Sequence, residues 1–362
     1  MKIARAEVVP YALPFREPYV TARGTLTQRE MALLRLRDED GLVGLGEAVP
    51  LSLRGSTSLA TVVAELEALA GREELDEETL RGDAPGLSAP ARCAALTALL
   101  DLRGRRATAM GEPSDATSAG ESSAAADLQP IECNATLIAG EPAAVAADAE
   151  RWATEGFGTF KLKLGAGDDV GQVRAVRDAL GPAAKIRVDA NAAWDVQVAA
   201  RILSQIEPFE IELVEQPAPT LEELAQIGAA TSIPVAGDES IESRADAEQA
   251  VRLGACDLTG VKLSKVGGPE EAIEIATVMP VYMTSALDGP VGIAAAAQVA
   301  QTLDAQRMGG ASHLAHGLAT QRLFTSTVAS VECELRDGML HLPPGPGLGV
   351  EINEDALRMH RL

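Results

Sequence analysis

From Ile131 onward, short apolar runs alternate with alanine-rich stretches that have helical periodicity. The runs are Ile131–Ile138, Thr159–Leu164, Ile186–Val188, Ile211–Val214, Ile233–Ala236, Leu258–Leu263 and Pro280–Met283, with a weaker eighth near Met308–Ala315. Strands that alternate with helices are typical of βαβ units and a parallel sheet. About eight such units in roughly 190 residues predict an α/β fold, a (β/α)8-type barrel. An open doubly wound sheet is the alternative, but no Gly-x-Gly-x-x-Gly motif follows the first run.

The chain before Ile131 has a mixed pattern. The predicted elements are a hairpin, Met31–Leu36 with Leu42–Gly46, and two helices, Ser58–Ala70 and Ser88–Leu102. Between Gly111 and Ala126 the residues become small and polar, which predicts a flexible connection. We therefore expect a domain boundary there, between an α+β domain and the barrel.

The composition is strongly acidic. The chain has 31 Lys and Arg against 53 Asp and Glu, a formal net charge of −22. Such a chain repels nucleic-acid phosphates and anionic membranes, so we expect neither as a partner. The four cysteines are widely spaced with no Cys-x-x-Cys, and no apolar run is long enough for a signal sequence or a membrane span. We expect a cytoplasmic protein with reduced thiols.

A polar side chain stands at the carboxyl end of five successive predicted strands. These residues are Lys163, Asp189, Glu215, Asp238 and Lys262, separated by 26, 26, 23 and 24 residues, and a further step of 26 reaches Asp288. In a barrel all of them would point into one mouth, where barrel enzymes have their active sites. Singly, each carboxylate is more typical of a helix N-cap or an ion pair. Three together require a cation, and an all-oxygen set predicts Mg²⁺, with Mn²⁺ as a substitute.

The lysines are few and clustered. The chain has only six, and four of them form the close pairs Lys161/Lys163 and Lys262/Lys265. Codon bias towards arginine would explain the scarcity but not the clustering, and lysine, unlike arginine, can lose its proton. Because neighbouring cations lower a lysine pKa, Lys163 and Lys262 are candidates for removing an α-proton from a carboxylate. Lys265, which two glycines follow, is expected to position a loop or lie exposed.

These residues belong to motifs of a known family. The motifs are FKLKLG (Phe160–Gly165), RVDANAAW (Arg187–Trp194), VEQP (Val214–Pro217), GDES (Gly237–Ser240) and VKLSKVGG (Val261–Gly268). As a set they resemble the enolase superfamily, and within it the muconate-lactonising-enzyme subgroup. The resemblance implies a modified TIM barrel over residues 130–324. It also implies an N-terminal α+β capping domain over 1–125, joined by part of the C-terminal segment, about 325–362.

The resemblance also implies residue roles. Asp189, Glu215 and Asp238 would bind Mg²⁺, and Lys163 and Lys262 would flank the α-carbon of the substrate. Lys161 would help to neutralise the substrate carboxylate and would lower the pKa of Lys163. The further candidates for substrate contact are Asn191, Arg23, Arg54, Ser285 and Asp288. Arg54 could meet a second substrate carboxylate, although a solvated loop charge explains it equally well.

The remaining loops bear on the reaction. Ser285–Ala296 and His316–Thr320 resemble the corresponding segments of o-succinylbenzoate synthases, which implies a lyase that dehydrates its substrate in menaquinone biosynthesis. The alternatives are an N-acylamino-acid or dipeptide racemase or epimerase, a muconate-type cycloisomerase, and, from a different class, a non-catalytic barrel. Dipeptide epimerases usually carry Asp-x-Asp after the eighth strand, and Leu314–Leu323 has none. We expect a small carboxylate substrate and a homo-oligomer.

Overall fold

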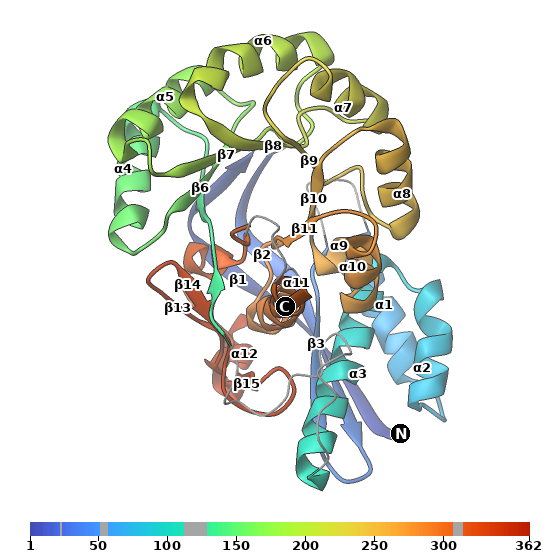
Figure 1. Cartoon of the computed structure of the whole chain (residues 1–362). Helices are drawn as coiled ribbons and strands as arrows, with labels where there is room; N and C mark the ends of the chain where they lie inside the picture. Colours follow the sequence, from blue (N-terminus) through green and yellow to red (C-terminus); the bar gives the residue numbers. More distant parts are fainter. Residues whose placement is uncertain (22–23, 51–56, 112–128, 307–313) are drawn as a thin grey trace.

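The computed structural model describes residues 1–21, 24–50, 57–111, 129–306 and 314–362. A curled parallel sheet with helices α4 to α8 along its outside forms one part of the molecule, and the N-terminal strands and helices lie beside it (Figure 1). The predicted α/β barrel fold is confirmed. Among the described helices, none combines the length and the apolar character needed to cross a membrane.

Seven parallel strands form the barrel sheet in sequence order. They are β5 (Ala135–Leu137), β6 (Thr159–Lys163), β7 (Lys185–Asp189), β8 (Ile211–Glu215), β9 (Val235–Gly237), β10 (Leu258–Val261) and β11 (Val281–Met283). Each lies within or overlaps a predicted apolar run. The helices between and after them are α4 (Pro142–Thr154), α5 (Asp169–Leu180), α6 (Val196–Ile206), α7 (Leu221–Gly228), α8 (Arg244–Leu253), the short α9 (Leu263–Val266), α10 (Pro269–Ala276) and α11 (Pro290–Gln306), with the 3-10 turns η3 (Glu207–Phe209) and η4 (Ala319–Leu323).

Side-chain caps begin several of these helices. The capping residues are Asp168 for α5, Asp195 for α6, Thr220 for α7 and Ser243 for α8. Each side chain accepts a hydrogen bond from a backbone N–H of the first turn, which has no partner within the helix. At α7 the cap is reciprocal, because Glu223 also accepts from the backbone N–H of Thr220. Polar residues after these four strands therefore fix where the next helix starts.

In the part of the chain that the structure describes, two isolated bridges connect the first and last strands of the barrel sheet. Most of the run expected near Met308–Ala315 lies outside the described residues, and the closing contacts come from His316 and Gly317. His316 bridges to Cys133 just before β5, and Gly317 bridges to Thr284 just after β11. Met283 donates its backbone N–H to Nδ1 of His316 at 2.9 Å, so this nitrogen carries no proton. The described residues His316 and Gly317 thus join the two edges of the sheet.

The N-terminal part is an antiparallel sheet covered by helices. Its strands are β1 (Ile3–Thr21), β2 (Gly24–Asp38) and β3 (Val43–Ala48), and its helices are α1 (Leu59–Ala70), α2 (Glu77–Asp83), the 3-10 turn η2 (Ala84–Gly86) and α3 (Ala89–Met110). The predicted hairpin is confirmed as β2 and β3, with Arg37 paired to Val43. Both predicted helices are present, and α3 extends well beyond the expected Leu102. Most of the connection expected at Gly111–Ala126 lies outside the described residues.

The backbone of β3 lies very close to α3 at Gly44 and Gly46. A Cβ atom on Gly46 would overlap the backbone carbonyl of Ala94. Gly46→Ala is therefore expected to lower the free energy of unfolding by about 3 kcal/mol, because the overlapped atom is backbone and the helix must shift. Thermal unfolding followed by circular dichroism measures this. Gly82→Ala in α2 is the matched control: nothing lies within 4 Å of its added Cβ, so its midpoint should stay the same or rise. Equal midpoints for the two variants would contradict the close packing.

The C-terminal segment returns to the N-terminal sheet. It contains β12 (Ala329–Val331), β13 (Glu334–Arg336), β14 (Met339–His341), β15 (Glu351–Ile352) and α12 (Glu354–His360), and β14 pairs with β4 (Ile131–Glu132). Leu362 donates its backbone N–H to Pro10 of β1 at 3.1 Å, and Arg35 of β2 pairs with Glu354 at 2.7 Å. A single hydrophobic core contains barrel residues together with Tyr11, Leu13 and Phe15 of β1. The placement of the domain boundaries remains a prediction.

Candidate active site

The polar residues predicted to share the barrel mouth lie at one edge of the sheet. Lys163, Asp189 and Glu215 are the last residues of β6, β7 and β8, and they are paired in register across the three strands. Asp238 directly follows β9, and Lys262 directly follows β10. The three carboxylates are fully buried, with 0% of each residue exposed. Because an unpaired buried carboxylate is very unfavourable, their negative charges must be compensated by neighbouring cationic groups.

Lys161 and Lys163 pair with two of the carboxylates. Nζ of Lys161 lies 2.6 Å from Oε1 of Glu215 and 2.9 Å from Oδ2 of Asp189, so both carboxylates converge on one cationic group. Nζ of Lys163 donates to Oδ2 of Asp189 at 2.6 Å and to Oδ1 of Asn191 at 3.0 Å. Four of the residues predicted on β6–β8, together with Asn191 from the following loop, therefore form one connected cluster.

The second lysine pair holds Asp238. Lys262 donates to Oδ2 of Asp238, and Lys265 donates to its backbone carbonyl and, at 3.0 Å, to its Oδ1. Lys265 is only 4% exposed, so an exposed side chain is ruled out. The reason is that Lys262 precedes the short helix α9, whose single turn places Lys265 on the same side. Lys265 thus belongs to the cluster as a group that holds Asp238.

The charges of the cluster reinforce one another. Burial disfavours the charged forms of Lys161 and Lys163, but the attraction of the carboxylates, Asp189 first, outweighs it and raises the pKa of both lysines. Burial likewise opposes the charge of Asp189, whose pKa is nevertheless held far below its usual range by the two lysines. Lys161 does lower the pKa of Lys163, but the net shift is upward. The effect of Lys161 thus has the expected direction, and the attraction of Asp189, 2.6 Å from Nζ of Lys163, outweighs it.

Three residues of the site were not predicted from the sequence: Tyr282, Arg187 and Gln216. Tyr282 of β11 donates its hydroxyl to Oε2 of Glu215 at 2.5 Å, and Arg187 of β7 lies 5.1 Å from the centre of the Tyr282 ring. Gln216, within the VEQP motif, accepts from the backbone N–H of Asp238 at 2.7 Å. The motif could have indicated Gln216, whereas a tyrosine inside an apolar strand reads as core. These groups orient the carboxylates.

Strained backbone gathers at the same edge. Asn191, Ala192 and Gln216 have φ of 48°, 61° and 36°, and Leu287 in the loop after β11 has φ of 65°. Non-glycine residues avoid this region, at a cost of about 1–2 kcal/mol each, and such residues cluster at functional sites. The first three lie within three residues after Asp189 or Glu215 along the chain. This strain fits a functional role for the loops that leave β7, β8 and β11.

The carboxylates fit a hard divalent cation in donor type, charge and burial. Asp189 and Glu215 already converge on the ammonium group of Lys161, and Asp238 follows the next strand. All six donor atoms are carboxylate oxygens, the ligands that Mg²⁺ prefers. Within the described part of the chain, no three His, Cys, Asp or Glu side chains have the spacing of a preformed metal site. A cation would therefore take over oxygens that now accept from lysine ammonium groups.

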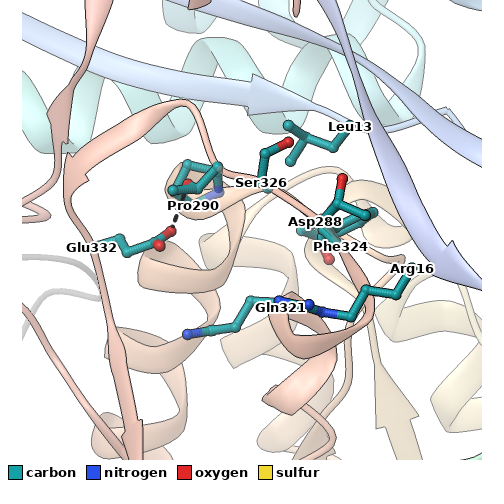
Figure 2. Close-up of a pocket in the computed structure, with 11 residues that line it drawn as sticks. Leu13, Arg16, Asp288, Pro290, Gln321, Phe324, Ser326 and Glu332 are labelled. Atoms are coloured by element: carbon teal, nitrogen blue, oxygen red, sulfur yellow. Dashed lines mark hydrogen bonds between the residues drawn. The ribbon is translucent and has the colours of Figure 1, made fainter. Parts of the chain in front are cut away.

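The remaining predicted contacts lie in two places. Ser285 and Asp288 follow β11 and bond to each other at 2.7 Å, and Thr320 donates to Ser285 at 2.8 Å. Asp288 lines a cavity of about 250 Å³. Figure 2 shows this cavity between β1 and the C-terminal segment; its lining includes Leu13, Arg16, Gln321, Phe324 and Glu332. Arg23 and Arg54 lie outside the described residues, so their predicted contacts remain untested.

Two family models match most of the chain. The family model described as enolase C-terminal domain-like matches residues 144–356, and the mandelate racemase/muconate lactonizing enzyme N-terminal domain matches residues 3–110. The chain is 38% identical to o-succinylbenzoate synthase of Thermobifida fusca (strain YX) over 183 residues, which are 49% of this chain and 56% of that protein. It thus aligns with about half of the length of that relative.

Solved structures of several related enzymes match nearly the whole chain, among them a muconate lactonizing enzyme and a dipeptide epimerase. Muconate lactonizing enzyme from Pseudomonas fluorescens, complexed with muconolactone, has a TM-score of 0.85 at 27% identity and covers 99% of both chains. Dipeptide epimerase from Enterococcus faecalis V583, complexed with Mg and the dipeptide L-Leu-L-Tyr, has a TM-score of 0.83 at 25% identity, over 97% of this chain and 100% of that one. Together with the two family models, these matches establish that the chain belongs to the enolase superfamily, with the N-terminal domain of the mandelate racemase/muconate lactonizing enzyme type.

Proposed function

We propose that this protein removes the α-proton of a small carboxylate substrate with the help of Mg²⁺, for which Mn²⁺ can substitute. One observation carries the proposal: Lys163 and Lys262 stand at the ends of β6 and β10, with the three carboxylates on the strands between them. In a closed barrel these two lysines face each other across the mouth. A substrate held between them would present one face to each ammonium or amine group.

Each residue of the cluster has a separate role in this proposal. Asp189, Glu215 and Asp238 would hold Mg²⁺, which supplies positive charge beside the substrate carboxylate and stabilises the negative charge that grows there. With the charge of Asp189 compensated by the cation, the pKa of Lys163 would fall, and Lys163 in its amine form would accept the α-proton. Lys161 compensates the negative charge of the carboxylate cluster, and Lys262 stabilises the deprotonated substrate by its positive charge. Tyr282, Gln216 and Lys265 keep the carboxylates in place.

Dehydration of the type performed by o-succinylbenzoate synthases is the specific reaction that we propose. Lys163 would take the proton from the α-carbon of a ring carboxylate and then return it to the departing hydroxyl, so that water leaves and the ring becomes aromatic. The similarity to the Thermobifida fusca enzyme supports this reaction, as do the segments Ser285–Ala296 and His316–Thr320. The product would enter menaquinone biosynthesis.

Racemisation or epimerisation is the second candidate, because the same two lysines could exchange protons on opposite faces of an α-carbon. The match to the dipeptide epimerase supports this reaction. The lack of Asp-x-Asp within Leu314–Leu323 speaks against a dipeptide with a free α-ammonium group and favours an N-acylamino acid. A muconate-type cycloisomerase, in which a lysine protonates or deprotonates the lactone, is the third candidate.

Proton nuclear magnetic resonance in D₂O distinguishes these reactions in one format. The enzyme with Mg²⁺ is incubated separately with the synthase substrate, N-succinyl amino acids, hydrophobic dipeptides and muconolactone. Dehydration should give the aromatic product, and racemisation should replace the α-proton by deuterium without a new product. If none of the four classes of compound shows exchange or gives a product, the result contradicts α-proton abstraction and favours a non-catalytic barrel.

A further inference from the structure

Glu47 joins the N-terminal sheet to the barrel through a buried contact. It lies on β3 and is 1% exposed. Its Oε2 accepts from the hydroxyl of Tyr11 on β1 at 2.7 Å, and its Oε1 accepts from the backbone N–H of Gly289 at 2.7 Å. Gly289 immediately precedes the long helix α11. One carboxylate thus connects two strands of the sheet to the start of a barrel helix.

The barrel side of the contact is shaped for this carboxylate. A Cβ atom on Gly289 would lie 2.6 Å from Oε2 of Glu47, and one on Gly292 would lie 2.9 Å from its Oε1. Only glycine at both positions leaves room for the carboxylate to approach the first turn of α11. The helix N-terminus favours a negative charge, since its N–H groups have no partners within the helix.

The same contact holds the loop that carries two candidate substrate contacts. Asp288 accepts at 2.7 Å both from the hydroxyl of Ser285 and from the backbone N–H of Ala286. Leu287, the residue before Asp288 in this loop, has the strained φ of 65°. A strained residue persists only where its surroundings fix the conformation. The bond from Gly289 to Glu47 fixes the loop at its far end.

The charge of Glu47 is costly to the fold. Burial, with a further contribution from Asp288, raises its pKa from 4.5 to about 7. The neutral carboxyl of Glu47 therefore contributes fully to the free energy of unfolding below the usual glutamate pKa of 4.5. This contribution is lost as the pH rises through about 7. The titratable and charged groups around the contact are Tyr11 on β1, Arg29 on β2, Cys93 on α3, Asp288 after β11 and Glu332 between β12 and β13. A neutral glutamine would avoid this cost, so stability alone does not account for a carboxylate here.

We propose that Glu47 is a positioning residue: its ionised carboxylate, anchored by Tyr11, fixes the loop Ser285–Gly289 and thereby places Ser285 and Asp288 against the substrate. The inference rests on the proposed function, because it assumes that this loop contacts the substrate. Charge-assisted hydrogen bonds from backbone N–H groups are about twice as strong as neutral ones, so ionisation tightens the loop. The N-terminal sheet therefore contributes to the active site through a residue that does not touch the substrate.

Glu47→Gln tests the proposal through KM and its pH dependence. The wild-type KM should rise about tenfold between pH 8 and pH 6, whereas the variant should show the higher value at both. Its kcat should change less than about threefold, since Lys163 and Lys262 do not contact Glu47. At pH 8 the variant should also melt a few degrees higher than the wild type, because the costly charge is gone. A purely structural residue would show the opposite, with a lower melting temperature and an unchanged KM.

Asp101→Asn is the matched control. Asp101 is another buried carboxylate whose oxygens accept from backbone N–H groups, of Leu45 on β3 and of Leu348. Asp101→Asn breaks the ion pair of Asp101 with Arg105 and should lower stability, but Asp101 does not contact the loop after β11, so KM should stay within about twofold. Tyr11→Phe, which removes the anchor but keeps the ring, should raise KM in the same direction as Glu47→Gln.

Hydrogen–deuterium exchange tests the loop without any substrate. At pH 8, amides in residues 284–292 should exchange about tenfold faster in Glu47→Gln, with the rest of the barrel unchanged. If the Glu47→Gln variant exchanged these amides at the wild-type rate, or had the wild-type KM at pH 8, the proposal would be overturned. If the wild-type protein turns over none of the candidate substrates, the proposed function fails, and the exchange experiment still decides whether Glu47 fixes the loop.

Discussion

Lys163→Ala is expected to reduce the rate of α-proton exchange by about 10³-fold, the effect of removing a general base from its substrate. The fold should survive this change. Asp189, which now accepts from Lys163 at 2.6 Å, keeps a second cationic partner in Lys161 at 2.9 Å, so its buried charge stays compensated. Exchange of the substrate α-proton in D₂O measures the effect, and circular dichroism verifies that the variant is folded.

Lys185→Ala provides the control for this variant. Lys185 begins β7, the strand beside Lys163, but its side chain is 47% exposed and its Nζ lies 3.6 Å from Glu212. Loss of a lysine there should leave the exchange rate within about twofold, as for most surface substitutions. A folded Lys163→Ala protein that exchanges at the wild-type rate would exclude Lys163 as the base, and Lys262→Ala would then be the next variant to measure.

Removal of divalent metal by EDTA is expected to abolish activity, and Mg²⁺ or Mn²⁺ should restore it. The protein should nevertheless stay folded, because Lys161 and Lys262 compensate the carboxylates without a metal. Mg²⁺ at one hundred times its Kd should add about 2.7 kcal/mol to the free energy of unfolding. Thermal unfolding with and without Mg²⁺ measures this shift independently of any substrate.

Two carboxylate variants sharpen the metal experiment. Glu215→Gln removes one proposed ligand and should lose most of the Mg²⁺-dependent rise in melting temperature. Asp257→Asn should keep it, because Asp257 precedes β10 at the other end of the barrel and accepts from the backbone N–H of Val235. Activity that survives exhaustive EDTA treatment would contradict the proposed mechanism, whatever the melting temperatures show.

Spacing along the chain predicted the core of the site. Lys163, Asp189 and Glu215 follow one another at intervals of a βα unit, so their places at successive strand ends follow from the fold class alone. The same reasoning could not find Tyr282, because a single tyrosine in an apolar strand does not reveal which carboxylate its hydroxyl reaches. The sequence also gave no reason to connect Glu47 with Gly289, more than two hundred residues further along.

The sequence by itself determined the barrel, its strand order, the polar residue at each strand end and the family, because the periodicity of alternating strands and helices fixes which residues share an edge. The tertiary structure alone decided that Lys265 is buried against Asp238, that Asp189 raises the pKa of Lys163, and that His316 and Gly317 join the two edges of the sheet. These properties depend on distances between side chains of different units. A shift of a few ångströms changes the sign of an electrostatic balance, and periodicity carries no information at that scale.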